Sequence, residues 1–224
     1  MKFKRMTVYG NPFIGVYARS NDLITIVGKS VIDSFKNVGE ILDTKVIGLN
    51  IGESDILGIL SVMNNHGMIV PRLTTEEEME TLKSIARENG MNLMVLEGKY
   101  TAVGNNIVAN DNGCIINPKI KRMEKEIEDT LDVEVVAAKV GGYGTPGSVI
   151  LATNKGFVAN PCVAENMDDV ELIKSILKVD GGVGTANDGV PFISICGIAN
   201  KNGIVVGETT TGYELGRLLE CLEG

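Results

Sequence analysis

The chain has 224 residues, of which 44% are hydrophobic and 4% aromatic, and its formal net charge is −8. This length allows one large domain or two small ones, and the composition indicates an ordinary globular protein with an aliphatic core. The negative charge argues against binding that depends mainly on neutralising nucleic-acid phosphates, and it is compatible with a basic protein partner.

The N-terminus is basic, but the segment that follows reaches a turn at Gly10 and lacks the apolar stretch of a signal peptide. No segment approaches the roughly 20 apolar residues of a membrane span. We therefore expect a cytoplasmic protein without a membrane segment. The four cysteines lie far apart and there is one histidine, so we expect free thiols, no metal site and no cofactor.

An internal repeat dominates the sequence. Each copy has an apolar run, a turn that contains Asn and ends in Gly, a second apolar run and usually a proline. Four clear copies occupy residues 57–71, 105–118, 148–161 and 192–206, and a degenerate fifth copy occupies residues 15–27. The turn glycines recur about every 45 residues, which is typical of a repeat architecture.

Each copy is predicted to start as a β-hairpin, because Asn and Gly in the turns tolerate positive φ. A helix should follow, since a single apolar stripe recurs after every hairpin, around Phe35, Leu82, Ile127, Ile173 and Leu218. Helix starts are signalled by Thr75 before three glutamates, by Pro118, and by Thr211 with Glu214 as a capping box. A further strand is expected at residues 45–49, 91–96 and 133–137.

One strand-strand-helix-strand unit cannot bury its helix face and its sheet alone, so the five units must share a core. We therefore predict a single α/β domain, residues 1–224, in which five repeats form a closed ring. The N-terminal run, residues 3–9, should pair with the last copy, because it would otherwise be an exposed edge strand.

Five ordered motifs resemble those of the translation initiation factor 6 family. They are IGES with LG at 51–58, NNHGMIVP at 64–71, TAVGN at 101–105, GTAN at 184–187 and TTGYEL at 210–215. The resemblance runs from about Gly10 to the last helix. It implies the pentein fold, an α/β propeller with pseudo-fivefold symmetry, and the shorter archaeal form without a eukaryotic C-terminal tail.

The resemblance also implies function. A member of this family binds the large ribosomal subunit, mainly ribosomal protein at the intersubunit face with nearby ribosomal RNA, and sterically keeps the small subunit from joining. Such a chain would act as a monomer and would not be an enzyme. The positions implied in contact, expected on one rim of the ring, are Gly58, Ile59, Asn64, Asn65, His66 and Asn105. Asn65 departs from the family pattern, which is usually basic there.

Two other classes of function remain open. Penteins include guanidine-modifying hydrolases, which need a cysteine nucleophile, a histidine and carboxylates that converge on the ring centre. Here His66 lies in a turn, Cys114 and Cys196 lie in predicted apolar strands, Cys162 follows a proline and Cys221 belongs to the last predicted helix. These positions favour structural roles.

The third class is a nucleotide-binding module. The glycine-rich residues 140–147 and 181–184 are not followed by Gly-Lys-Ser/Thr, and a strand rather than a helix is expected next. We interpret these glycines as points where the chain crossings approach closely near the ring axis.

Overall fold

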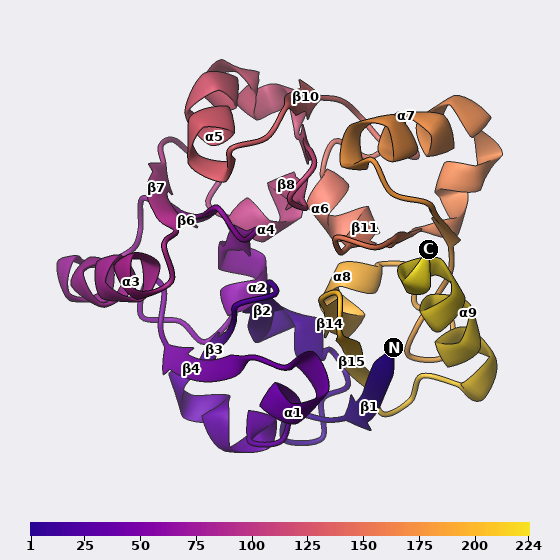
Figure 1. Cartoon of the computed structure of the whole chain (residues 1–224), viewed down its shortest axis with the longest axis horizontal. Coiled ribbons are helices and arrows are strands. Elements are labelled where there is room, and N and C mark those ends of the chain that lie inside the picture. The colour runs from indigo at the N-terminus through magenta and orange to yellow at the C-terminus, as the bar shows by residue number, and fades with distance from the viewer.

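The computed structural model describes residues 1–224 as five three-stranded sheets with helices outside them (Figure 1). In each sheet, two strands form an antiparallel hairpin and a third strand adds in parallel to the second. The α/β class and the repeat of five units are therefore confirmed.

The strands follow the repeat along the chain. The first hairpin strands are β2 (Ala18–Ser20), β5 (Val62–Met63), β8 (Ile107–Ala109), β11 (Ile150–Ala152) and β14 (Gly197–Ala199). The second are β3 (Ile24–Gly28), β6 (Gly67–Pro71), β9 (Cys114–Ile116), β12 (Phe157–Ala159) and β15 (Gly203–Gly207). The third are β4 (Lys45–Leu49), β7 (Asn92–Leu96), β10 (Val135–Ala137) and β13 (Gly181–Val183), with β1 (Lys2–Met6) in the last sheet.

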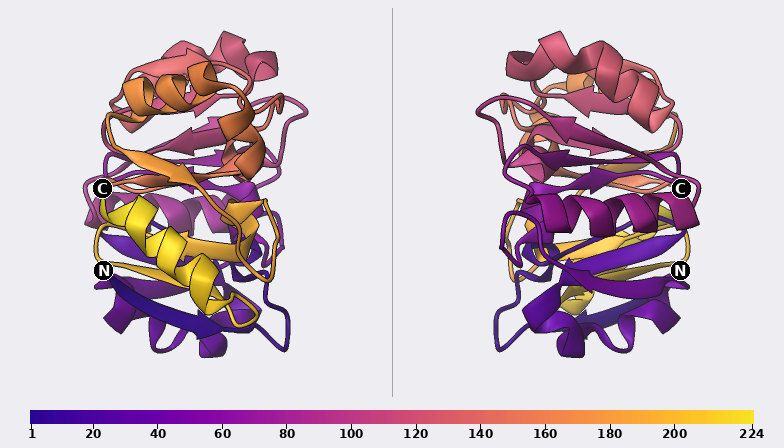
Figure 2. Two further views of the ribbon diagram at one scale, coloured as in Figure 1. Left: turned by 90° about the vertical axis from the view of Figure 1, so that its right-hand side faces the viewer. Right: turned by 90° about the vertical axis from the view of Figure 1, so that its left-hand side faces the viewer.

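The N-terminal strand pairs with the last unit, as predicted. Strand β1 runs parallel to β15 from Lys2 beside Gly203 to Met6 beside Gly207. The chain ends lie on the same side of the molecule (Figure 2), where the N-terminal amine contacts the Glu223 carboxylate. One sheet is thus assembled from both ends of the sequence.

The outer helices lie where the apolar stripes predict them. They are α1 (Val38–Leu42), α3 (Glu76–Glu88), α5 (Glu124–Leu131), α7 (Met167–Leu177) and α9 (Gly212–Glu223). Three of them follow 3-10 segments: η2 (Lys29–Phe35) precedes α1, η3 (Pro118–Met123) precedes α5, and η4 (Pro161–Glu165) precedes α7. Capping boxes join Thr75 to Glu78 and Thr211 to Glu214. No helix is long and apolar enough to cross a lipid bilayer.

One class of element was not predicted. A short helical turn precedes every first hairpin strand: η1 (Ile14–Val16), α2 (Leu57–Leu60), α4 (Val103–Asn106), α6 (Pro146–Val149) and α8 (Ile193–Cys196). The predicted first strands were therefore too long, and Cys196 belongs to a helix rather than to a strand. A short apolar run has no periodicity that separates a buried strand from a buried helical turn.

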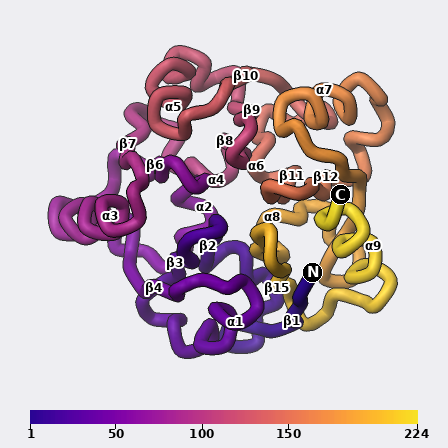
Figure 3. Tube along the Cα trace, viewed as in Figure 1, coloured from indigo at the N-terminus to yellow at the C-terminus, as the bar shows by residue number.

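These short helices contact one another in cyclic order, because η1 packs on α2, α2 on α4, α4 on α6, α6 on α8, and α8 on η1. The first strands follow the same circuit, with β14 against β2 (Figure 3). Every hydrophobic cluster draws on two consecutive units, and the last pairing places Ile198 and Val205 beside Phe35 and Leu42. Neighbouring units therefore stabilise one another by shared apolar burial.

The turn glycines serve a different purpose from the one predicted. Gly67, Gly113, Gly156 and Gly203 do not have positive φ. Instead, a Cβ added at any of them would overlap a backbone carbonyl oxygen near the end of the next unit's outer helix, for example Thr130 opposite Gly67. Close approach between units, not turn conformation, explains the glycines.

Candidate functional site

The hairpins give the molecule two distinct ends. We call the end formed by η1, α2, α4, α6 and α8 the helix end, and the end formed by the five hairpin turns the turn end. Each first strand leads from the one to the other. The residues predicted to share one rim are divided between them: Gly58, Ile59 and Asn105 lie at the helix end, and residues 64–66 lie at the turn end.

Five equivalent residues, four asparagines and Thr153, lie around the axis at the turn end and are joined by four hydrogen bonds. Asn21 donates from Nδ2 to the backbone oxygen of Asn64 (2.7 Å), Asn64 to that of Asn110 (3.1 Å) and Asn110 to that of Thr153 (3.0 Å). Asn200 returns to Asn21 (3.0 Å). All five are buried. We call this set the asparagine ring.

The ring side chains also hold the turns and the helices. The Oδ1 of Asn64 accepts from the backbone N–H groups of His66 and Gly67, and its Nδ2 donates a second bond to Leu131, the last residue of α5. Asn110 does the same for Leu177 of α7, and Asn200 for Leu42 of α1. Asn64 is therefore a structural residue, because its hydrogen-bonding groups are used within the chain.

A second set of polar residues follows the ring, one position later in each turn. Asn65 donates from Nδ2 to carboxylate oxygens of Asp22 (3.1 Å) and Asp111 (2.6 Å), and Asn154 donates to the same two oxygens at 2.7 Å. Lys201 lies 3.7 Å from Asp22. The family pattern is usually basic at the position of Asn65. In this chain the Asn65 amide bridges two carboxylates instead.

Glycine lets the backbones meet at the helix end. A Cβ on Gly58 would overlap the backbone oxygen of Gly15, one on Gly104 would overlap that of Gly58, and one on Gly147 would overlap that of Gly104. Gly58 is buried in this contact, so a partner does not reach its Cα. The predicted role of glycine near the axis holds for Gly147, whereas Gly181 and Gly182 lie in β13 at the periphery.

Two neighbouring asparagines of α4 have opposite roles. Asn106 is buried, donates to the backbone oxygen of Ala102 (2.8 Å) and accepts from Nδ2 of Asn117 (2.6 Å). The side chain of Asn105 is half-buried and has no hydrogen bond within the chain. Of the predicted positions at the helix end, Ile59 and Asn105 are the ones that present side chains to the surface.

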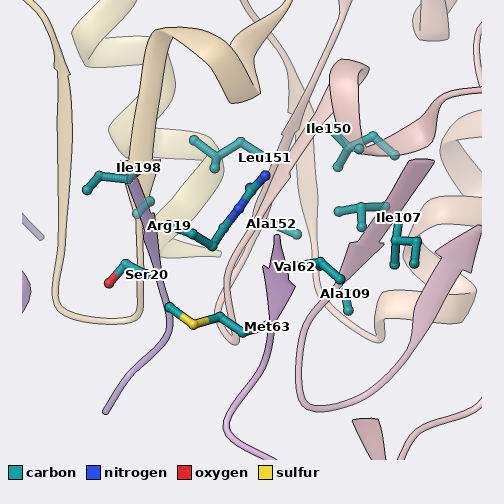
Figure 4. Close-up of a pocket in the computed structure, with 13 residues that line it drawn as sticks. Arg19, Ser20, Val62, Met63, Ile107, Ala109, Ile150, Leu151, Ala152 and Ile198 are labelled. Carbon is teal, nitrogen blue, oxygen red and sulfur yellow. The ribbon is translucent and has the colours of Figure 1, made fainter. Parts of the chain in front are cut away.

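A cavity of about 30 Å³ lies inside the circuit of first strands (Figure 4). We call it the inner cavity. Aliphatic side chains line most of it, including Val62, Leu151 and Ile198, and the Arg19 side chain extends among them. Sequence reasoning missed Arg19, although the repeat register carries the signal: at the equivalent position the other units have Val62, Val108, Leu151 and Ile198.

Two glutamates fasten loops at the helix end. Glu78 accepts hydrogen bonds from the backbone N–H groups of Gly52 (2.7 Å), Glu53 (2.8 Å) and Thr75 (2.9 Å). Glu214 likewise accepts from the backbone N–H groups of Gly189 and Thr211. Burial alone would raise the pKa of each carboxyl, but the hydrogen bonds outweigh it and the pKa is lowered.

The four thiols are free. Burial raises the pKa of all of them, that of Cys196 to about 12, which disfavours the reactive thiolate. No hydrogen bond joins the ring of His66 to a cysteine, and no group of three or more His, Cys, Asp or Glu side chains is arranged to hold a metal ion.

A groove of about 430 Å³ lies beside α4 and is lined by three cations, Lys99, Lys119 and Arg122, by one carboxylate, Glu97, and by Tyr100. We call it the basic groove. The ammonium of Lys99 lies 5.5 Å from the ring centre of Tyr100, and none of the three cations forms a salt bridge. The bond between Asn117 and Asn106 holds η3 against α4, so the groove belongs to the helix end.

Comparison with known proteins finds sequence similarity over almost all of the chain. Translation initiation factor 6 of Methanocaldococcus jannaschii is 40% identical over 210 residues, which cover 92% of this chain and 91% of the relative. The factor 6 proteins of Staphylothermus marinus and Pyrococcus abyssi are each 35% identical over 226 residues and at least 99% of both chains. The model of the eIF-6 family matches residues 3–221, and the chain therefore belongs to the eIF-6 family.

Proposed function

We propose that the chain binds the large ribosomal subunit and sterically prevents the small subunit from joining it. The observation that carries this proposal is the family match over residues 3–221. The architecture supports it, because a domain whose five units are tied together by buried side chains is well suited to occupy space rigidly. We extend the proposal to a monomeric, cytoplasmic protein with one pentein domain and no catalytic activity.

We assign the contact with ribosomal protein to the helix end. Asn105 supports this choice, since its half-buried amide has no partner within the chain, and the half-buried Ile59 adds apolar surface on α2. Exposed positions on a rigid scaffold are where binding residues concentrate. Gly58 and Asn64 lie outside this proposed contact, because both are buried in structural roles.

The basic groove beside α4 fits the contact with ribosomal RNA. Lys99, Lys119 and Arg122 are exposed and without salt bridges in a protein whose net charge is −8. Such a local cluster of positive charge can contact phosphates, although the net negative charge of the whole protein disfavours phosphate binding elsewhere. The nearby amide of Asn105 would then lie where protein and RNA surfaces meet.

The hydrolase alternative gains no support from the geometry. All four thiols have raised pKa values, and three of them are buried. His66 lies at the turn end, and the chain's own Arg19 occupies the centre where a guanidinium substrate would have to bind.

Co-sedimentation with salt-washed archaeal large subunits tests the proposal. The wild-type protein should bind stoichiometrically and, when small subunits are added, reduce the peak of joined ribosomes. Asn105→Ser should weaken binding at least about tenfold, a loss of the size expected for one interface residue. Asn112→Ser is the matched control, because Asn112 is half-buried, lies at the turn end and also lacks a side-chain hydrogen bond.

Absence of wild-type binding at low salt, with ribosome joining intact, would overturn the function. Equal binding by wild type and Asn105→Ser, with loss in Asn112→Ser, would keep the function but move the contact to the turn end. Charge reversal at Lys119 tests the RNA contact separately, since it should reduce both the affinity and its salt dependence.

A further inference from the structure

Arg19 interrupts an apolar layer inside the circuit of strands. Its side chain is half-buried and lines the inner cavity, and the four equivalent positions of the repeat are aliphatic. The deep position lowers the pKa of Arg19 from 12.5 to about 10, because burial disfavours the charged form. The guanidinium therefore still carries a positive charge at neutral pH.

The hydrogen-bonding capacity of Arg19 is largely unused. Its NH2 group donates to the backbone oxygen of Gly58, while Nε is buried and has no partner. Arginine has five N–H donors, and no carboxylate forms a salt bridge with this one. A buried charge without a counter-charge is strongly unfavourable.

The nearest acidic groups of the axis are engaged elsewhere. Asp22 and Asp111 line an adjoining pocket at the turn end, where the amides of Asn65 and Asn154 donate to their oxygens. Lys201 also lies beside Asp22. The guanidinium points the other way, toward Gly58 at the helix end. Neither carboxylate forms a salt bridge or a hydrogen bond with Arg19.

The size of the inner cavity limits what can bind. A volume of about 30 Å³ is enough for about two water molecules or one monatomic anion, and too small for a nucleotide or a sugar. Water would satisfy the donors without neutralising the charge. A small anion does both.

We propose that the inner cavity is a binding site for one small monovalent inorganic anion of the size of chloride, held by the Arg19 guanidinium and enclosed by the aliphatic side chains of the five first strands. The site is distinct from the ribosome-facing surface, and it makes the anion an internal counter-ion of the fold.

Refolding in defined salts tests this site, because the salt chosen determines which anions are present when the cavity forms. Wild type and Arg19→Met are refolded from urea into sodium chloride or sodium gluconate at equal ionic strength, gluconate being too large for the cavity. Methionine suits the position, since the equivalent residues are aliphatic. The same proteins are crystallised with bromide, which is located by its anomalous scattering.

The expected result is a bromide peak beside Nε of Arg19 in the wild type. At chloride concentrations above the dissociation constant of the site, the wild-type unfolding equilibrium constant should also fall about tenfold for each tenfold rise in chloride. Arg19→Met should show no such response. Ordered water alone in the cavity of bromide crystals, with equal wild-type stability in chloride and gluconate, would overturn the proposal. The crystallographic arm decides the question even if Arg19→Met does not fold.

Discussion

The side-chain amide of Asn110 donates to the backbone oxygen of Thr153 at 3.0 Å, but Thr153 has no amide with which to continue the asparagine ring. Its hydroxyl instead accepts from the backbone N–H groups of Lys155 and Gly156, which keeps the turn intact. The ring is consequently open at one junction, between the fourth and fifth units. Four bonds of the ring and this one gap determine how firmly the turn ends of neighbouring units are joined.

Thr153→Asn should close the ring. The new amide can donate to the backbone oxygen of Asn200, and the gain should be about 0.5–1.5 kcal/mol, the net value of a hydrogen bond. Urea unfolding monitored by circular dichroism measures the change. An unchanged or lower midpoint would show that the fourth turn does not reach the geometry of the other four.

Asn105 and Asn106 should separate binding from stability. Asn106→Ser removes a buried amide that bonds Ala102 and Asn117, so the free energy of unfolding should fall by about 1–3 kcal/mol. Asn105→Ser should change it by less than about 0.5 kcal/mol, because its side chain has no partner in the chain. Calorimetry on both variants is the measurement, and comparable losses of stability would contradict the assignment of Asn105 to binding.

The glycines of the helix end should tolerate no side chain. Gly104→Ala places a Cβ against the backbone oxygen of Gly58 and should cost about 3 kcal/mol, since backbone cannot move aside as a flexible side chain can. Gly216→Ala is the control. Gly216 is exposed within α9 with no atom near its added Cβ, so this change should stabilise by up to about 1 kcal/mol. Similar effects of the two changes on thermal unfolding would argue against close backbone packing.

Glu78 should make stability depend on pH in the acid range. Its folded-state pKa lies below the ordinary value of 4.5, so its contribution is present above that value and is lost as pH falls through the lower folded-state pKa. Glu78→Gln should therefore be less stable than wild type at pH 7, and the difference should shrink on acidification. Urea midpoints measured between neutral and acid pH give this difference directly. A gap that stays constant or widens at low pH would mean that the charged form is not the one that holds the loop.

Much of the architecture follows from local patterns in the sequence. The apolar stripes located the outer helices, the threonine and glutamate pairs located two capping boxes, and residues 45–49 match β4. These features depend on periodicity and on contacts within a few residues. The short helices were missed because a four-residue apolar turn has no such period, and the hairpin glycines were misinterpreted because their constraint comes from a neighbouring unit.

In the candidate contact surface, too, some features follow from local sequence and others from contacts between units. Sequence motifs singled out Asn105 and Asn64 alike, but nothing in the chain order indicates that one amide is free while the other bonds the turn of the next unit and the end of α5. Arg19 could have been noticed as the one charged residue at its position in the repeat, yet its enclosure requires all five first strands. The sequence by itself determined the number of units, their outer helices and the family. Only the tertiary structure decided which equivalent residues meet around the axis, because those contacts join residues tens of positions apart.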